Sequence, residues 1–278
     1  IFNYMNFALL NNQLTEEKEI RLTNKNRGFL YGDGFFETIK IFNKKPFNLQ
    51  NHFHRIIYSV DLLDIKFSLS ILDLNKSISM LIDKNNIQSG SVRVSIYRNS
   101  IGKYLPKENS SSILINSKND IEYMFVKRKF LDIGYYKENL KSPSPLSNLK
   151  SLNSLLYVMA SKYAKENNFD DVILFNTNKN IIETTNSNLF ILNHNKVITS
   201  PLKDGCVDGS MRKLLFLIIK NKYELIEESI SENDIENSSE VILSNSTYGV
   251  RGVKKINIKT YNDSSLYNYL INSLNKLI

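Results

Sequence analysis

The sequence predicts a two-domain protein that mixes α-helices and β-strands, of the α/β or α+β class. Three observations support this: a length of 278 residues, a 42% content of hydrophobic residues, and helical and strand periodicity in both halves of the chain. At about 100 to 200 residues per domain, this length suits one large or two modest domains. The polar stretch Lys118 to Asp120 is the expected boundary between a small N-terminal α/β domain (1–118) and a larger C-terminal domain (119–278).

The N-terminal half is expected to hold a sheet and a helix. Alternating apolar residues predict strands at Phe35–Phe42, Val92–Tyr97 and Ser111–Ile115. Between the first two strands, apolar residues at helical spacing run from Leu49 to Leu63. On that helix, the polar residues His52, Arg55 and Ser59 fall together on the adjoining face.

The C-terminal half repeats this mixture of elements. A helix is expected after Lys150, to about Glu166, with Leu152, Leu155, Leu156 and Met159 on its inner side. Further apolar runs predict strands at Val172–Phe175, Asn188–Leu192, Lys196–Thr199 and Val241–Ser244, and a helix from Arg212.

Composition excludes several classes of protein. Cys206 is the single cysteine, so no intrachain disulfide can form, and three histidines without further cysteines make no zinc site, so no metal is expected. The N-terminal stretch lacks the basic start and apolar core of a signal peptide, and no apolar run reaches about 18 residues, so we expect a cytoplasmic protein that does not bind membranes. The formal charge of +8 comes from scattered lysines, which favours a small anionic substrate or cofactor over nucleic acid.

One lysine stands out from its surroundings. Lys150 is the only charge between Ser142 and Ala160, where it follows two prolines and precedes the apolar helix pattern. A lysine in this position can simply extend its ammonium into water. A desolvated lysine, by contrast, becomes an amine nucleophile that can form a Schiff base, as in enzymes that use pyridoxal phosphate.

The other parts of such a site are present as candidates. Pyridoxal phosphate needs a carboxylate for its ring nitrogen and donors for its phosphate. Glu183 lies between two predicted strands in a stretch rich in Thr and Asn, where it could also be an ordinary turn residue. Gly205 and Gly209 precede an apolar helix, so the backbone N–H groups of Ser210 and Met211 can point at an anion. Candidate phosphate partners from elsewhere in the chain are Arg55 and Ser246.

Six motifs now resemble, in order, those of the class IV (fold type IV) pyridoxal phosphate-dependent aminotransferase family. They are RGFLYGDGFFETIKIF, HFHRIIYSVDLL, NLKSLNSLL, DDVILFNTNKNIIETTNSNLF, SPLKDGCVDGSMR and VILSNSTYGV, between residues 27 and 250. The family comprises branched-chain and D-amino acid aminotransferases and aminodeoxychorismate lyase. The resemblance implies a homodimer of two-domain subunits with the cofactor between the domains.

The resemblance also implies roles for individual residues. Lys150 becomes the Schiff-base lysine and the base that takes the substrate proton, and Glu183 becomes the partner of the pyridine nitrogen. The expected phosphate ligands are Arg55, Ser210, Met211 and Ser246. The expected substrate-binding residues, on loops that close the site, are Tyr31, Arg98, Lys103, Asn245 and Thr247.

The choice of reaction depends on a few positions. Thr38, Met211 and Asn245 resemble the lyase pattern, in which a threonine hydroxyl assists elimination of pyruvate, although a β-branched residue also suits a strand. The loop after Arg98 has no Arg-x-His pair, which D-amino acid aminotransferases use to bind a carboxylate. Where the lyase uses an arginine in this loop, Lys103 is at best a substitute, because a lysine offers a point charge without a bidentate fork.

We therefore favour 4-amino-4-deoxychorismate lyase, which forms 4-aminobenzoate and pyruvate for folate synthesis. The alternative is an aminotransferase that acts on branched-chain or D-amino acids with 2-oxoglutarate. A third hypothesis is a relative that binds the cofactor without catalysis, against which the intact Lys150, Glu183 and Arg55 argue.

Overall fold

The computed structural model describes residues 6–278, which divide into two compact units. Unit 1 extends to Met124 and also contains Lys150–Asn153, while unit 2 contains Phe125–Leu149 and Ser154–Ile278. Both units combine helices with β-sheet, which confirms the expected mixed fold class. Residues 1–5, with which the stretch considered as a signal peptide begins, lie outside the described residues.

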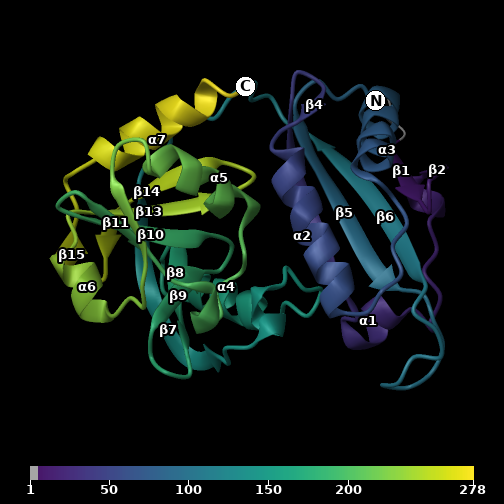
Figure 1. The fold of residues 1–278 in the computed structure, drawn as a ribbon, viewed down its shortest axis with the longest axis horizontal. Helices are drawn as coiled ribbons and strands as arrows, with labels where there is room; N and C mark the ends of the chain where they lie inside the picture. The colour runs from purple at the N-terminus through teal and green to yellow at the C-terminus, as the bar shows by residue number, and fades with distance from the viewer. Residues whose placement is uncertain (1–5) are drawn as a thin grey trace. The chain divides into compact units, whose positions relative to one another are not determined.

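Unit 1 is built on one antiparallel sheet with the strand order β2-β1-β6-β5-β3-β4 (Figure 1). In chain order, its elements are β1 (Phe7–Leu10), β2 (Gln13–Glu16), the 3-10 helix η1 (Glu17–Glu19), α1 (Arg27–Tyr31), β3 (Gly34–Phe42), β4 (Lys45–Pro46), α2 (Leu49–Leu62), α3 (Ile71–Lys84), β5 (Gly90–Arg98) and β6 (Ser111–Asn119). The predicted strands are confirmed as β3, β5 and β6, and the predicted helix as α2.

The two faces of this sheet differ in what they contact. Ile39 and Ile41 of β3 pack with Val92 of β5 and with apolar residues of α2 and α3, so both helices cover the same face. Because side chains alternate along a strand, Phe36 and Thr38 lie on the opposite face. The division of functional residues in unit 1 follows from this alternation.

Unit 2 contains a larger sheet and more helices. Its elements are β7 (Leu131–Lys141), the 3-10 helix η2 (Pro145–Asn148), α4 (Leu155–Glu166), β8 (Asp171–Asn176), β9 (Ile181–Thr184), β10 (Asn188–Asn193), β11 (Lys196–Thr199), the 3-10 helix η3 (Leu202–Asp204), α5 (Ser210–Ile219), β12 (Glu224–Glu227), α6 (Glu232–Asn237), β13 (Glu240–Asn245), β14 (Gly249–Ile256), β15 (Lys259–Thr260) and α7 (Ser265–Asn275). The predicted strands correspond to β8, β10, β11 and β13, and the predicted helix begins two residues earlier, as α5.

The strands of unit 2 close on themselves. The sheet runs β12-β11-β10-β13-β14-β7-β8-β9, and β9 pairs again with β10, so six strands from β10 to β9 form a ring. β7, β8 and β14 pair in parallel, while β10, β13 and β14 pair antiparallel. Apolar side chains of these strands, among them Ile173, Leu189 and Leu243, form one buried cluster.

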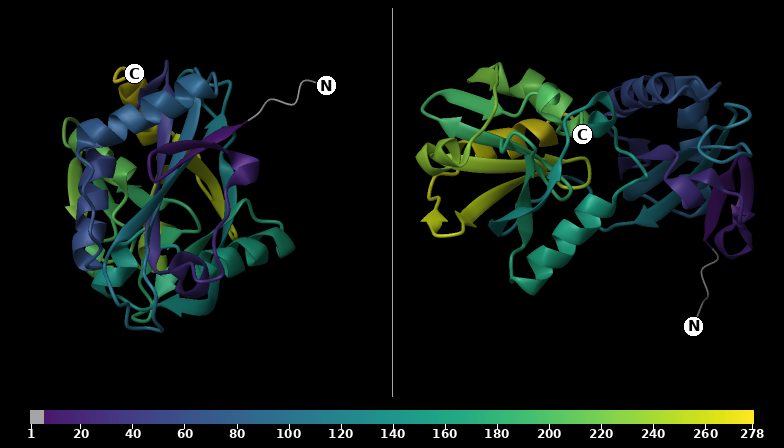
Figure 2. Two further views of the ribbon diagram at one scale, coloured as in Figure 1. Left: turned by 90° about the vertical axis from the view of Figure 1, so that its right-hand side faces the viewer. Right: turned by 90° about the horizontal axis from the view of Figure 1, so that it is seen from below.

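Helix α4 differs from the sequence expectation. Leu155 and Met159, expected on its inner side, are 67% and 42% exposed, and the buried residues are Ala160 and Ala164. The small alanine side chains let the helix approach β7 and β8 closely. Leu156, also expected on the inner side, does pack against the same buried cluster as the two alanines. Figure 2 (right) shows α4 as the teal helix below the sheet of unit 2.

The division into units also differs from the expected boundary at residue 118. β6 continues to Asn119, and Asp120 then forms an ion pair of 2.6 Å with the buried Lys40 of β3, which keeps this segment with unit 1. Lys150–Asn153 belongs to unit 1 by its contacts, whereas the sequence placed the lysine in the C-terminal domain. The reason is backbone pairing with β3, described below.

Within residues 6–278, every helix is too short or too polar to cross a membrane.

Candidate active site

A buried carboxylate organises one face of unit 1. Glu37 of β3 is fully buried and accepts hydrogen bonds from Arg55 Nε (2.6 Å) and Nη2 (2.7 Å). Its Oε2 also lies 2.6 Å from Nδ1 of His52, one turn earlier on α2. The three side chains therefore form one hydrogen-bonded group between β3 and the helix that covers it.

The charges of this group determine its protonation. Burial alone would raise the pKa of Glu37, but the charge and hydrogen bonds of Arg55, followed by those of His52, outweigh burial and lower this pKa to about 2. Burial lowers the pKa of His52, Glu37 opposes that shift, and the charges of Arg55 and Lys150 add to it. Glu37 is thus a carboxylate whose charge balances Arg55 at neutral pH.

Glu37 and His52 were not identified as site residues from the sequence. The signals were present, because the alternation in FFETIKIF places Glu37 on the face opposite Thr38, and His52 shares a helix face with Arg55. A carboxylate on the apolar face of a strand needs a buried cation, and the next helix supplies one.

Lys150 lies beside the start of β3. The Phe36 N–H donates to the Lys150 carbonyl (2.9 Å), and the Leu152 N–H donates to the Gly34 carbonyl (3.0 Å), so this segment pairs with β3 like a short extra strand. Gly34 is needed here, since a Cβ would come within 2.4 Å of the Ile96 carbonyl oxygen on β5. This pairing places the Lys150 ammonium 4.5 Å from the centre of the Phe36 ring.

Thr38 and a second cation share the face that carries Phe36. Thr38 is half-buried and pairs across strands with Arg93 of β5. The Arg93 guanidinium lies 3.5 Å from the centre of the Phe36 ring. Arg93 was not expected from the sequence, although alternation from Val92 and Val94 would have placed it opposite the apolar core.

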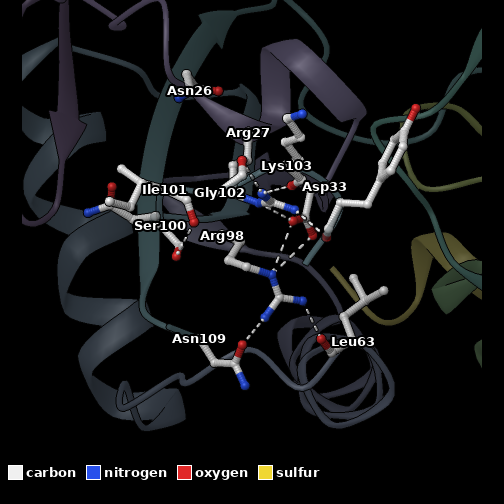
Figure 3. Close-up of polar contacts among 12 residues, drawn as sticks. Asn26, Arg27, Asp33, Leu63, Arg98, Ser100, Ile101, Gly102, Lys103 and Asn109 are labelled. Carbon is white, nitrogen blue, oxygen red and sulfur yellow. Dashed lines mark hydrogen bonds and ion pairs between the residues drawn. The ribbon is translucent and has the colours of Figure 1, made fainter. Parts of the chain in front are cut away.

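Two buried arginines hold the loop that follows β5 (Figure 3). Arg27 of α1 bonds Asp33 through Nε (2.7 Å) and donates from Nη1 and Nη2 to the successive carbonyls of Gly102, Lys103 and Tyr104 at 3.2, 2.5 and 3.1 Å. The loop is consequently fixed through its backbone.

Arg98 is part of the same arrangement rather than an available cation. It bonds Asp33 through Nε (3.1 Å), and it donates to the Leu63 carbonyl (2.5 Å), the Asp64 carbonyl (2.8 Å) and Asn109 Oδ1 (2.6 Å). Four of its five N–H groups are therefore engaged within unit 1. The expected role of Arg98 in binding substrate conflicts with this geometry, and a role in positioning the loop fits it.

The other predicted substrate residues of unit 1 lie on the surface that this loop forms. The Tyr31 and Tyr104 rings are 5.6 Å apart, and the Arg27 guanidinium lies 4.9 Å from the Tyr31 ring centre. Both tyrosines and Lys103 are exposed. They remain accessible to a ligand, unlike Arg98.

In unit 2, a β-bulge determines the side of the sheet to which the Glu183 side chain points. The pairing of β8 with β9 shifts register between Leu174 and Phe175, which leaves Ile182 as an extra residue and sets Glu183 opposite Leu174. Leu174 belongs to the cluster that α4 covers, and directly paired residues share a sheet face. Glu183 consequently points to the side of the sheet from which α4 contributes polar groups.

Three donors bind the Glu183 carboxylate. Oε1 accepts hydrogen bonds from Lys141 Nζ (2.7 Å) and the Tyr157 hydroxyl (2.8 Å), and Oε2 accepts one from the Val207 N–H (2.8 Å). Burial and the charge of Glu183 raise the pKa of Tyr157 well above its usual value, so its hydroxyl stays protonated and donates. Neither Lys141 nor Tyr157 was expected from the sequence, because neither lies in a motif.

The predicted phosphate ligands of unit 2 are adjacent. Helix α5 begins after Gly209, so its N-cap residue carries no side chain. The Ser210 hydroxyl lies 2.9 Å from that of Ser246 in the turn after β13. Two hydroxyls and the first N–H groups of a ten-residue helix, including that of Met211, form an arrangement that suits a phosphate.

The neighbouring turn explains the positions of the last two predicted residues. Asn245 Oδ1 accepts hydrogen bonds from the N–H groups of Thr247 (2.9 Å) and Tyr248 (3.1 Å), and its Nδ2 donates to the Asn186 carbonyl (3.3 Å). The amide of Asn245 therefore shapes the turn, whereas the Thr247 side chain is exposed.

Comparison with known proteins identifies the family. The family model for amino-transferase class IV matches residues 34–256. The chain is 24% identical over 272 residues to the D-alanine aminotransferase of Staphylococcus haemolyticus, which covers 94% of this chain and 93% of that protein.

Solved structures are similar in fold over almost the whole chain. A Legionella pneumophila protein assigned to 4-amino-4-deoxychorismate lyase matches with a TM-score of 0.87 at 26% identity, covering 94% of this chain and 97% of that one. The branched-chain aminotransferase of the archaeon Thermoproteus uzoniensis, solved with norvaline, matches with a TM-score of 0.89 at 18% identity, covering 97% of this chain and 93% of that one. The chain belongs to the class IV aminotransferase family, whose members depend on pyridoxal phosphate.

Proposed function

We propose that this protein is a 4-amino-4-deoxychorismate lyase that forms 4-aminobenzoate and pyruvate. The observation that carries the proposal is the environment of Thr38. Its hydroxyl lies on the sheet face of Phe36, over whose ring the Lys150 ammonium stands at 4.5 Å. Among residues 6–278, no protein group hydrogen-bonds this hydroxyl, which leaves it able to act on a substrate.

The described residues fit pyridoxal phosphate. In our proposal Lys150 binds the cofactor covalently and Glu183 holds its ring nitrogen. Ser210, Met211, Ser246 and Arg55 bind the phosphate. Two properties support this: the Ser210 and Ser246 hydroxyls lie together at the N-terminus of α5, and the Glu183 carboxylate has accepted fewer hydrogen bonds than it can.

The lyase chemistry assigns a task to each residue on the Thr38 face. The cofactor, when bound, supplies an electron-accepting ring. The Lys150 amine takes the proton from the substrate ring carbon that bears the amino group. The Thr38 hydroxyl hydrogen-bonds the ether oxygen as the bond between that oxygen and the ring breaks. The ring becomes aromatic 4-aminobenzoate, and the three-carbon group leaves as the enol of pyruvate, which takes up a proton to become the keto acid.

Arg93 is suited to binding the same substrate. The substrate carries two carboxylates, and a site for it needs cations that are not already neutralised. Arg93 pairs with Thr38 across the strands, and the structure gives its guanidinium a ring contact with Phe36 and a hydrogen bond to the Ser95 hydroxyl, but no carboxylate partner among the described residues. We assign Arg93 to a substrate carboxylate, in place of the engaged Arg98.

The second candidate is an aminotransferase for D-amino or branched-chain amino acids. The full-length similarity to the D-alanine aminotransferase favours it. Transamination has no leaving ether oxygen, so it gives the Thr38 hydroxyl no task. In addition, the loop from Asn99 to Asn109 contains no arginine or histidine that could bind a substrate carboxylate.

Product analysis separates the two candidates. The protein, loaded with pyridoxal phosphate, is incubated with 4-amino-4-deoxychorismate, and separately with a panel of L- and D-amino acids plus 2-oxoglutarate. The lyase proposal expects equal amounts of 4-aminobenzoate and pyruvate, absent with Lys150→Ala. Glutamate formation without 4-aminobenzoate would replace the lyase by the aminotransferase, and no product in either assay would support the non-catalytic hypothesis.

A further inference from the structure

A buried cation accompanies the Glu183 carboxylate in unit 2. Lys141 stands at the end of β7, after a register shift in its pairing with β8, and its side chain is 11% exposed against 3% for Glu183. The Lys141 ammonium also bonds the Tyr157 hydroxyl at 2.6 Å, so Lys141, Tyr157 and Glu183 close a triangle of hydrogen bonds. The proposed function uses only Glu183 of these three.

The three hydrogen bonds do not use all of the acceptor positions of the Glu183 carboxylate. A carboxylate has about four lone-pair directions, two on each oxygen. Lys141 and Tyr157 occupy both directions on Oε1, and the Val207 N–H occupies one on Oε2. Glu183 can therefore accept one more strong donor, and that donor must approach Oε2.

The charge of Lys141 affects how strongly that donor is held. An ammonium 2.7 Å from a carboxylate in a low-dielectric environment neutralises most of the field that the carboxylate exerts on other groups. The ammonium also repels a second cation bound to the same carboxylate. This repulsion disfavours the charged form of the second cation. With Lys141 in place, Glu183 is a weaker partner for a protonated ring nitrogen than an isolated carboxylate would be.

We propose that Lys141, supported by Tyr157, is a positioning residue that fixes Glu183 and moderates its hold on the cofactor's ring nitrogen. This inference rests on the proposed role of Glu183 toward pyridoxal phosphate. Its consequence is that this chain sets the electron-withdrawing strength of the cofactor ring through a residue that does not touch the cofactor.

The test compares two cofactors that differ at the ring nitrogen alone. Dissociation constants are measured by equilibrium dialysis for pyridoxal phosphate and for its analogue with C–H in place of the ring nitrogen. We define the ratio as the dissociation constant of the analogue divided by that of pyridoxal phosphate. This ratio reports the interaction at the nitrogen, because all other contacts cancel. Lys141→Met keeps the apolar stem and removes the ammonium, so this ratio should rise about tenfold or more in favour of pyridoxal phosphate.

Tyr157→Phe gives a second measurement should Lys141→Met fail to fold. It removes one neutral hydrogen bond from Oε1, so the ratio should rise in the same direction by about two- to fivefold. The matched control is Lys137→Met, because Lys137 lies on the same strand and forms a 2.7 Å ion pair with Glu232 at the surface. Its ratio should equal that of the wild type.

The outcomes separate this inference from the proposed function. Glu183→Gln should lower the ratio, and an unchanged ratio in that variant would remove Glu183 from the ring nitrogen and contradict the proposed function. A lowered ratio with Glu183→Gln, combined with wild-type or lower ratios for both Lys141→Met and Tyr157→Phe, would overturn the role of Lys141 alone.

Discussion

Glu37 accepts two hydrogen bonds from one edge of the Arg55 guanidinium, through Nε at 2.6 Å and Nη2 at 2.7 Å. Such a paired contact fixes the plane of the guanidinium as well as its position. The proposed phosphate arginine is thus oriented by a residue of β3, and the third member, His52, binds the same carboxylate. The stability of unit 1 and the orientation of Arg55 therefore depend on one side chain.

The first prediction concerns that side chain. Glu37→Gln keeps the shape but leaves the buried Arg55 without its negative partner, which typically costs about 3 to 5 kcal/mol. Urea unfolding should show a loss of this size. Asp83→Asn breaks an exposed ion pair with Lys44 and should cost about 0 to 1 kcal/mol. Similar losses of unfolding free energy in the two variants would contradict the role of Glu37 as the buried partner of Arg55.

The second prediction concerns pH. The pKa of Glu37 falls from 4.5 in the unfolded chain to about 2 in the folded one, so its stabilisation is complete above about pH 4.5 and is lost as pH falls toward 2. For a fully buried group this shift corresponds to about 3 kcal/mol. The pKa of His52 is also lowered in the folded chain, so the free energy of unfolding decreases further as the pH falls below about 6.5.

Urea titrations between pH 7 and pH 3 check this. The difference in unfolding free energy between wild type and Glu37→Gln should narrow steadily below pH 4.5. A difference that stays constant or widens would show that Glu37 is not held as a carboxylate.

The third prediction separates the side chain of Lys150 from its backbone. Lys150→Ala should abolish turnover and the visible absorbance of covalently bound cofactor. The backbone hydrogen bonds to β3 do not use the side chain, so the unfolding free energy should change by about 1 kcal/mol or less. Absorbance and turnover that persist in this variant would assign the covalent role to another lysine.

The fourth prediction tests the lyase assignment through Thr38. Thr38→Val preserves the branched shape and removes the hydroxyl, so formation of 4-aminobenzoate should fall by the factor typical of acid catalysis, about 100- to 10,000-fold. Any transaminase activity should be nearly unaffected. Equal losses in both assays would mean that Thr38 serves the strand and not the elimination.

The fifth prediction concerns the loop after β5. Arg27→Met removes the donor to three successive carbonyls, so amide hydrogen exchange across residues 99–109 should accelerate. Arg21→Met is a suitable control, since Arg21 is exposed and, among residues 6–278, its hydrogen bonds go to the nearby carbonyls of Lys18 and Ile20. Unchanged exchange in Arg27→Met would show that the loop is held by other contacts.

The sequence predicts those features that depend on local pattern. Alternation identifies β3 and β5, and it separates Thr38 from Glu37 because side chains of a strand alternate in direction. Six motifs, taken together, identify the family that the comparison confirms. Neighbouring hydroxyls such as those of Ser210 and Ser246 are predictable only through those motifs, since the two residues lie on separate elements.

Other features depend on tertiary contacts that no local pattern reveals. The bulge that directs Glu183 and the hydrogen bonds from Lys141 and Tyr157 arise from pairing among β7, β8 and β9. The engagement of Arg98 arises from loops distant in the chain. The inner side of α4 was predicted only in part: Leu156 packs inward, whereas Leu155 and Met159 are exposed, because helical spacing shows which residues share a face and not which face is buried.

The pairing of Lys150–Asn153 with β3 has a consequence for the order in which the chain folds. The partners of this pairing, such as Phe36 and Lys150, are separated in the chain by the rest of unit 1 and by the first strand of unit 2. A nascent chain can form the sheet of unit 1 before the lysine segment has been synthesised, but it cannot complete the edge of β3. Contacts between such distant segments form late. The segment that carries the lysine on which catalysis is proposed to depend is thus the last part of unit 1 to be synthesised and to take its place.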